Sequence, residues 1–409
     1  MTQTSFDKAK IRILLLEGVH ASAVNSFREH GYSNITELSH ALSGDELCDA
    51  ISDVHVLGLR SRSQLNARCL AAARRLMAVG CYCIGTNQVE LGCAAISGIP
   101  VFNAPFSNTR SVAELVLAEA ILLLRGVPQK SLQMHQGIWQ KSARASFEVR
   151  GKTLGVIGYG NIGAQLGVLA EALGMRVVFH DSVKKLNLGN AHQVANLAEL
   201  LKLSDVVSLH VPATEQTRNM IGALELALMK PTAVFINASR GNVVDLDALG
   251  ERLLAGQLLG AAIDVFPHEP GSNDDPFASP LIGKPNTLLT PHIGGSTLEA
   301  QVNIGIEVSE KLIRYSDNGS TLSAVNFPQV TLPEQDNKHR LLHIHHNVPG
   351  VLSAINQVVS EAGINISAQY LQTNSTIGYV VMDVDAEYSS TALDRLTEVP
   401  GTIRTRVLF

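Results

Sequence analysis

The sequence has few aromatic residues, few cysteines and no long apolar run. Aromatic residues make up 5% of the 409 residues, and Trp139 is the single tryptophan. The cysteines are odd in number and lack paired CxxC spacing, so they predict neither a disulfide framework nor a zinc site. They are Cys48, Cys69, Cys81, Cys83 and Cys93. We therefore expect a protein of the reducing cytoplasm.

Membrane insertion and nucleic-acid binding are disfavoured on similar grounds. The longest apolar helical stretch, residues 112–124, is too short to cross a bilayer and carries Glu114 and Glu119. The N-terminal sequence MTQTSFDKAK is polar and does not read as a signal peptide. The net charge is −5, so the chain lacks the basic excess that nucleic acid would require. An anionic substrate would need a local cluster of arginines.

Apolar residues make up 45% of the chain, which is enough to build sizeable cores. The length predicts two or three domains. Strand-like apolar runs alternate with helical patterns up to residue 295, as in an α/β protein. The first series of strands is expected at 11–18, 55–60, 76–81 and 100–103. The second is expected at 152–158, 175–181, 205–212, 232–241, 259–266 and 286–292.

Two predicted helices, 110–125 and 299–315, mark the junctions between these series. We therefore expect a discontinuous substrate-binding domain, 1–107 and 296–332, around a dinucleotide-binding domain, 108–295. The last domain, 333–409, begins with a polar linker at 333–338. It then follows the βαββαβ order of a ferredoxin-like unit. The predicted fold class is α/β, with two Rossmann-like doubly wound domains and this C-terminal domain.

A glycine-rich motif, GYGNIG at residues 158–163, follows a predicted strand and opens a helix. Gly158 permits a tight turn, Gly160 lets backbone N–H groups approach a pyrophosphate, and Gly163 allows close helix–strand packing. The next strand ends at Asp181, which alone would read as a turn residue. With the glycines at this spacing, its carboxylate can accept ribose hydroxyls and repel a 2′-phosphate. The pattern predicts binding of NAD rather than NADP.

Three ionisable residues follow three later strands: Arg240, Glu269 and His292. Ligands of an open parallel sheet bind beyond the carboxyl ends of its strands, so we expect these side chains to meet near the nicotinamide. His292 suits a general base near neutral pH, Glu269 can orient its ring, and Arg240 can hold an anionic substrate. Each residue alone would read as structural or solvated. Together they predict hydride transfer from a small 2-hydroxy acid.

The sequence Arg60-Ser61-Arg62 follows another predicted strand. Two arginines that flank a hydroxyl can clamp a phosphate. An isolated RSR sequence is more often a solvated loop, but strand ends of the first domain should face the substrate crevice. Asn108, just past the domain crossing, is a further candidate for substrate contact.

The motifs GYGNIG, INASRG, DVFPHEP and LLTPHIGGST, together with Asp181, resemble those of the D-isomer-specific 2-hydroxyacid dehydrogenase family. Runs such as GLRSRS (58–63), GCYCIGTNQV (80–89) and PVFNAPFSNTRSVAE (100–114) extend the resemblance over nearly the whole chain. The resemblance implies that Arg240, Glu269 and His292 are the catalytic arginine, acid and base. It also implies an NAD site lined by Asn161, Ile162, Asp181, Ala238, Ser239, Arg240, Asp264, His292, Ile293, Gly294 and Gly295.

The similarity is to bacterial-type members of the family that carry a terminal regulatory domain. It implies NAD-dependent oxidation of 3-phosphoglycerate to 3-phosphohydroxypyruvate, which commits a glycolytic intermediate to L-serine synthesis. It also implies a homotetramer.

The C-terminal unit resembles an ACT domain, a small-molecule sensor. Its loop HIHHNVPG (343–350) opens a helix whose N–H groups can hold an amino-acid carboxylate. The resemblance places His345 and Asn347 on an L-serine effector, and we expect Asn365 to reach it from a neighbouring subunit. The HxHH spacing also fits a metal, but strand alternation and the resemblance explain these histidines without one. The linker EQDNK (334–338) lacks the glycine pair of a flexible hinge.

Two alternatives stay open. The chain could be another 2-hydroxyacid dehydrogenase, acting on hydroxypyruvate, glyoxylate, 2-oxoglutarate or a sugar-acid phosphate; the RSR loop and the sensor favour the phosphorylated substrate. The same fold also serves in NAD-sensing scaffolds that bind partner proteins. The complete set of Arg240, Glu269 and His292 favours an enzyme.

Overall fold

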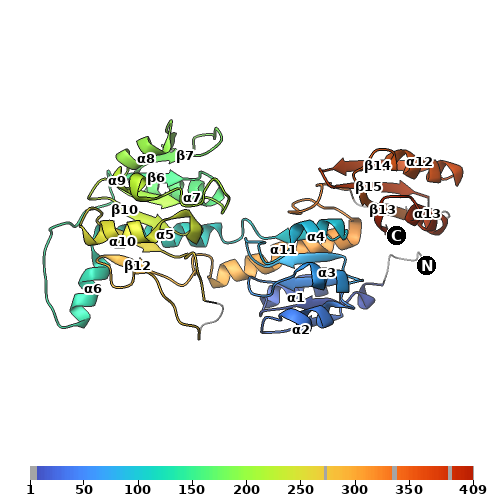
Figure 1. Cartoon of the computed structure of the whole chain (residues 1–409), viewed down its shortest axis with the longest axis horizontal. Helices are drawn as coiled ribbons and strands as arrows, with labels where there is room; N and C mark the ends of the chain where they lie inside the picture. The colour runs from blue at the N-terminus through green and yellow to red at the C-terminus, as the bar shows by residue number, and fades with distance from the viewer. Residues whose placement is uncertain (1–6, 271–273, 334–338, 386–388, 409) are drawn as a thin grey trace. The chain divides into compact units, whose positions relative to one another are not determined.

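The computed structural model describes residues 7–270, 274–333, 339–385 and 389–408. The chain forms two compact units (Figure 1). Unit 1 comprises Met1–Ser107 and Gln301–Phe409, and unit 2 comprises Asn108–Ala300. The chain thus leaves unit 1, builds unit 2 and returns. The finer boundary near residue 333 stays a prediction, and the linker 334–338 lies outside the described residues.

The first sheet of unit 1 has five parallel strands in the order β2-β1-β3-β4-β5. Strands β3, β4 and β5 are buried throughout, as expected where helices cover both faces of a parallel sheet. Helices α1 and α11 contribute to one core, and α2, α3 and α4 to the other. The elements are η1 (Lys8–Lys10), β1 (Ile13–Leu15), α1 (Ala21–Glu29), β2 (Ile35–Glu37), α2 (Gly44–Ile51), β3 (Val56–Leu59), α3 (Ala67–Ala72), β4 (Ala78–Cys81), α4 (Leu91–Ile96), β5 (Val101–Asn103) and α11 (Leu298–Asn318).

Unit 2 is built on seven parallel strands in the order β12-β11-β10-β9-β6-β7-β8. Helices α5 and α7 pack on one face and α8, α9 and α10 on the other. The strand order reverses between β6 and β9, where ligands bind in doubly wound sheets. The elements are α5 (Thr109–Leu124), α6 (Val127–His135), β6 (Thr153–Ile157), α7 (Asn161–Ala172), β7 (Arg176–His180), β8 (His192–Gln193), α8 (Leu197–Leu203), β9 (Val206–Leu209), α9 (Ala223–Ala227), β10 (Val234–Asn237), η2 (Gly241–Val243), α10 (Leu246–Leu254), β11 (Gly260–Ile263) and β12 (Thr287–Leu289).

The C-terminal part of unit 1 is a four-stranded antiparallel sheet in the order β14-β15-β13-β16. Its elements are β13 (His339–His346), α12 (Val351–Glu361), β14 (Ile366–Thr373), β15 (Ile377–Val384), α13 (Ser389–Thr397) and β16 (Thr402–Leu408). Leu341, Val380 and Met382 pack against the helices, whereas Leu342 and Ile344 join the core of the first sheet. Alternate side chains of β13 therefore pack into two different cores. The predicted α/β fold class with a ferredoxin-like domain is confirmed.

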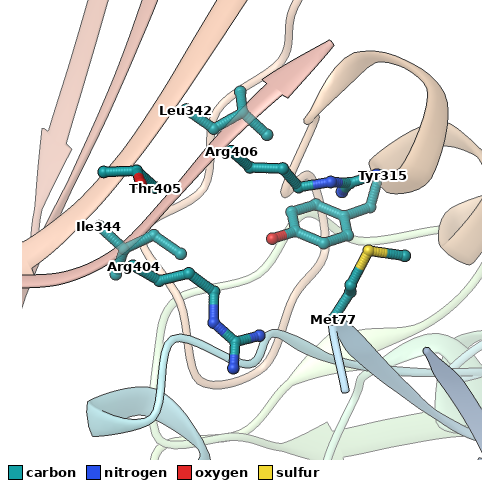
Figure 2. Close-up of a pocket in the computed structure, with 7 residues that line it drawn as sticks. All are labelled: Met77, Tyr315, Leu342, Ile344, Arg404, Thr405 and Arg406. Carbon is teal, nitrogen blue, oxygen red and sulfur yellow. The ribbon is translucent and has the colours of Figure 1, made fainter. Parts of the chain in front are cut away.

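The second face of this antiparallel sheet packs against α11 and the start of β4 (Figure 2). The guanidinium of Arg406 lies 5.7 Å from the ring centre of the buried Tyr315, a cation–π contact. Arg404 donates a hydrogen bond to the carbonyl of Leu76, beside Met77. Arginines on β16 thus join the C-terminal sheet to the rest of unit 1.

A buried ion pair reinforces this junction. Arg340 on β13 is fully buried and bonds both carboxylate oxygens of Asp383 on β15, at 2.6 and 2.8 Å. It also donates to the carbonyls of Asn318 and Pro333, at 3.1 and 3.0 Å. A buried charge needs this complete set of partners.

The expectation that no cysteines pair is wrong. Cys48 on α2 and Cys69 on α3 form a disulfide, with Cα atoms 4.5 Å apart. Their separation of 21 residues gives no signal in the sequence, because only the packing of α2 against α3 brings them together. Cys81, Cys83 and Cys93 remain thiols.

Candidate active site

The glycine-rich loop lies at the switch point of the unit 2 sheet, directly after β6. Gly158 has φ +90°, and a Cβ there would clash with the carbonyl oxygen of His210, which follows β9. A Cβ on Gly163 would clash with the carbonyl oxygen of Gly158, whereas a Cβ on Gly160 would meet nothing within 4 Å. The open space beside Gly160 is where a pyrophosphate could approach the backbone.

The start of α7 and the end of β7 complete this loop. Helix α7 begins at Asn161, followed by the half-buried Ile162, and no side chain caps it. Uncapped N–H groups and the helix dipole favour an anion there. The carboxylate of Asp181 accepts hydrogen bonds from the N–H groups of Tyr159 and Val183, at 2.9 and 3.1 Å. A helix start that favours an anion and a carboxylate near it fit the pyrophosphate and a ribose of NAD.

Glu269 and His292 meet beyond the carboxyl ends of β11 and β12. His292 Nδ1 donates to Glu269 Oε2 at 2.8 Å, and Glu269 Oε1 accepts from the Phe266 N–H at 3.1 Å. The hydrogen bond to Glu269 raises the pKa of His292, although burial opposes it. Burial alone would raise the pKa of Glu269, but the hydrogen bond and charge of His292 outweigh it, so the pKa is lowered. This leaves the other ring nitrogen, Nε2, for a substrate.

Arg240 follows β10 and caps η2. Its charge lowers the pKa of both Glu269 and His292, so it belongs to the same electrostatic site. Its loop is fixed by Asn237, whose amide donates to the Arg240 carbonyl at 3.0 Å and accepts from the N–H and hydroxyl of Ser239. The half-buried Ala238 lies between Asn237 and Ser239. The sequence argument missed Asn237, whose only signal is a polar residue at the end of an apolar strand.

Asp264, which follows β11, holds the loop that carries His292. Its Oδ1 accepts from the Thr290 hydroxyl and the Ile293 N–H, at 2.6 and 2.8 Å, and its Oδ2 accepts from the Gly294 N–H at 2.8 Å. Its carbonyl accepts from the His292 N–H at 2.8 Å. His292 has φ +54°, a conformation that residues other than glycine rarely adopt. The surrounding bonds to Asp264 enforce it.

Asn108 lies against this loop within unit 2. A Cβ on Gly295 would clash with the Asn108 side chain, so the two are in close contact. The buried Oδ1 of Asn108 has no hydrogen-bond partner among the described residues. An unpaired acceptor at this position is a candidate for contact with a ligand hydroxyl.

The Arg60-Ser61-Arg62 loop belongs to unit 1, directly after β3. The buried Glu17 accepts hydrogen bonds from the N–H groups of Arg60, Arg62 and Ser63, at 3.3, 2.9 and 2.8 Å. Arg60 is half-buried, and Ser61 and Arg62 are exposed. Glu17 thus fixes the loop through its backbone and leaves the guanidinium groups available. Sequence reasoning missed Glu17.

Two of the predicted effector residues, His345 and Asn347, lie at the end of the C-terminal sheet beside the turn between β14 and β15, and Asn365 lies at the opposite end. His345 is 3% exposed, and its Nδ1 donates to the His346 carbonyl at 2.8 Å. The Asn347 amide donates to the Asn374 carbonyl at 2.7 Å, and Asn365 is exposed just before the edge strand β14. In the described ranges, no group of three or more histidine, cysteine, aspartate or glutamate side chains could hold a metal ion.

Known proteins share these features. Residues 117–294 match the D-isomer specific 2-hydroxyacid dehydrogenase, NAD binding domain, and residues 341–404 match the AHAS small subunit-like ACT domain. The chain is 58% identical over 411 residues to D-3-phosphoglycerate dehydrogenase of Escherichia coli (strain K12), with 100% of both chains covered. It is 48% identical over 406 residues to D-3-phosphoglycerate dehydrogenase of Dictyostelium discoideum, with 99% of each covered.

A solved structure of D-lactate dehydrogenase from Aquifex aeolicus, complexed with NAD and lactic acid, is 25% identical. The two structures superimpose with a TM-score of 0.67, and the match covers 77% of this chain and 100% of the D-lactate dehydrogenase chain. The chain therefore belongs to the D-isomer-specific 2-hydroxyacid dehydrogenase family. The predictions of an NAD-dependent oxidoreductase and of a C-terminal ACT domain are confirmed. None of the described helices is both long and apolar enough to cross a membrane.

Proposed function

We propose that this chain oxidises the C2 hydroxyl of 3-phosphoglycerate to the ketone of 3-phosphohydroxypyruvate with NAD. This is the first committed step of L-serine synthesis. The observation that carries the proposal is the Glu269–His292 hydrogen bond with the charge of Arg240 beside it. It occurs in a chain that is 58% identical, end to end, to a D-3-phosphoglycerate dehydrogenase.

In this reaction His292 Nε2 accepts the proton of the C2 hydroxyl. Glu269 orients the ring through Nδ1 and stabilises the imidazolium that forms. Bound NAD supplies the hydride acceptor. Arg240 holds the substrate carboxylate with a charge-assisted hydrogen bond. The Asp181 carboxylate selects NAD because it would repel the 2′-phosphate of NADP.

The phosphate of the substrate is assigned to the loop of unit 1. Arg60 and Arg62 offer two guanidinium groups on either side of the Ser61 hydroxyl, and Glu17 fixes the loop backbone. Asn108 is assigned to the substrate as a further polar contact. A phosphorylated 2-hydroxy acid uses all of these groups, whereas hydroxypyruvate or glyoxylate has no phosphate for Arg60 and Arg62 to bind.

Steady-state kinetics with NAD test this assignment, with 3-phosphoglycerate compared against D-glycerate. Arg60→Ala and Arg62→Ala should each weaken kcat/KM for 3-phosphoglycerate by about tenfold or more and leave D-glycerate less affected, because a charged hydrogen bond is lost. Arg68→Ala is the matched control, since this exposed arginine pairs with Asp45. Equal losses for both substrates would contradict phosphate binding, and no turnover of either would contradict the activity.

His292→Ala tests the base. Turnover should fall by roughly 10²–10⁴-fold, the usual contribution of general acid–base catalysis. The dissociation constant for NAD should change little, because the pyrophosphate is assigned to the loop at Gly160. A loss of turnover of about threefold or less would be far smaller than general acid–base catalysis predicts, and would exclude His292 as the base.

We extend the proposal to regulation and assembly. The ACT domain would bind L-serine through His345, Asn347 and a neighbouring subunit's Asn365. L-Serine, the end product of the pathway, would thereby inhibit the enzyme. The exposed edge strand β14 favours pairing with a second copy of the domain. We propose a homotetramer that works in the cytoplasm, where a glycolytic substrate is made.

A further inference from the structure

Glu119 is a buried acid that the proposed chemistry does not use. It lies on α5 between the buried Val116, Ala120 and Leu123, and is 3% exposed. Neither carboxyl oxygen has a hydrogen-bond partner among the described residues. An ionised carboxylate in such surroundings would be costly. Burial, reinforced by the charge of Asp264, raises the pKa of Glu119 to about 8, so the side chain carries a proton at neutral pH.

The neighbouring acid is in the opposite situation. Asp264 is 2% exposed, but the hydroxyl of Thr290 and the N–H groups of Ile293 and Gly294 all donate to its carboxylate. Helix α5 packs against β11, which Asp264 follows; of these two buried acids, one is thus matched by donors and the other is not. Two such groups cannot both ionise cheaply.

The charge on Asp264 reaches the catalytic base. It contributes to raising the pKa of His292, and the Asp264 carbonyl accepts the His292 N–H. The rare φ of His292 persists only while the loop stays attached to Asp264. A second negative charge, on Glu119, would repel the carboxylate of Asp264 and change the field at His292.

We propose that Glu119 is a positioning residue: as a neutral acid it leaves Asp264 the single negative charge behind the 290–294 loop, and its ionisation loosens that loop. The inference rests on the proposed role of this loop in binding NAD and carrying the base. An apolar residue would fill the same space at a lower free-energy cost of burial. What the acid adds is a proton that dissociates at high pH.

Other charged groups near α5 do not account for this behaviour. Strands β10 and β11, which pack against α5, carry no charged side chain. Helix α7 contributes Glu171, and α6 contributes Lys130 and His135. Besides burial, the pKa of Glu119 responds to Asp264 and not to these three.

The test compares wild type with Glu119→Gln, which keeps the shape and removes the proton. NAD affinity is measured by calorimetry from pH 6 to pH 10, without substrate. In wild type the Kd should rise by up to about tenfold per pH unit above the pKa of Glu119, since one proton is linked to binding. In Glu119→Gln this rise should be absent. Glu114→Gln, on the exposed face of the same helix, is the control and should behave as wild type.

A second measurement detects the proton itself. Infrared difference spectra between wild type and Glu119→Gln at pH 7 should show a carboxylic-acid C=O band that only wild type has. In wild type alone the band should vanish as the pH passes about 8. If Glu119→Gln does not fold, this wild-type titration still decides. No such band, or identical pH dependence of NAD binding in both proteins, would overturn the proposal. If wild type gives the expected NAD-binding and infrared results but does not turn over 3-phosphoglycerate, the proposed function is contradicted and the role of Glu119 is not.

Discussion

A single hydrogen bond makes the protonation of Glu269 and His292 interdependent. The bond raises the pKa of the imidazole, and it keeps the pKa of Glu269 low although burial opposes this. The base therefore gains a proton more readily when the alcohol releases one, at the cost of being protonated already at mildly acidic pH. Alcohol oxidation should consequently have an acidic limb set by His292.

Glu269→Gln tests this coupling. Without the negative charge, the pKa of His292 falls, so the acidic limb of kcat/KM should move to lower pH. The plateau should also fall, because the imidazolium loses its stabilising partner. A pH profile from 5 to 9 measures both effects, with Glu215→Gln, an exposed acid paired with Arg218, as the control. An acidic limb that does not move would contradict the pairing.

Residues with local signatures could be predicted from the sequence. Gly158, Gly163 and His292 each sit next to a recognisable strand, and topology alone brings strand ends together. Glu17 could not be predicted, because its partners are backbone N–H groups 43 to 46 residues further along the chain. Glu119 reads in the sequence as a polar interruption of an apolar helix, and only the packing of α5 against β11 lets the charge of Asp264 act on it.

At the scale of elements, strands with an apolar run could be predicted, whereas two short, exposed edge strands could not. The predicted runs contain β1, β3, β4 and β5, and also the strands of unit 2 other than β8. The edge strands β2 and β8 have three and two residues and expose much of their surface, so they lack the apolar run that signals a strand. The packing of α2 against α3 could not be predicted from the sequence either, and neither could the disulfide that joins these helices.

The disulfide predicts a measurable contribution to stability. Cross-linking residues 21 apart should add about 3 kcal/mol by restricting the unfolded chain. Cys48→Ser should therefore lower the free energy of unfolding by that amount in urea without reductant, and the difference should disappear when reductant is added. Cys93→Ser, a thiol on α4, is the control. Thiol titration of the unfolded, unreduced protein should find three thiols; five would contradict the disulfide.

At the scale of the whole molecule, an exposed apolar segment follows α5. Trp139 is 76% exposed, and Leu132 and Met134 on α6 are 54% and 52% exposed. A tryptophan at the surface of one chain, rather than in its core, favours a role in an interface between subunits. Figure 1 shows α6 and the loop after it reaching away from the unit 2 sheet.

Sedimentation of Trp139→Gly tests whether this segment joins subunits. We expect a smaller assembly than wild type, because a large apolar contact is removed. Leu186→Gly, which alters another exposed apolar residue of unit 2, should keep the native assembly. If Trp139→Gly also keeps it, the segment has no role in assembly.

The proposed regulation by the ACT domain would act through its contacts with the rest of unit 1. Arg340 bonds the carbonyls of Asn318 and Pro333, and the Tyr379 hydroxyl donates to the Gly319 carbonyl at 2.6 Å. Removing residues 338–409 would therefore expose core as well as delete the sensor. A point variant at the effector site is the cleaner experiment.

Asn365→Ala is that variant. Asn365 is exposed at the start of the edge strand, so its loss should leave folding and uninhibited turnover unchanged. The serine concentration for half-inhibition should rise by about tenfold or more, the loss expected for a hydrogen bond to a charged head group. Asn356→Ala, an exposed asparagine on α12, is the control.

In wild type, serine should lower turnover without competing with 3-phosphoglycerate, since a ligand held between two subunits shifts their relative orientation rather than occupying the catalytic site. Competition with 3-phosphoglycerate, or serine sensitivity unchanged in Asn365→Ala, would place the effector elsewhere.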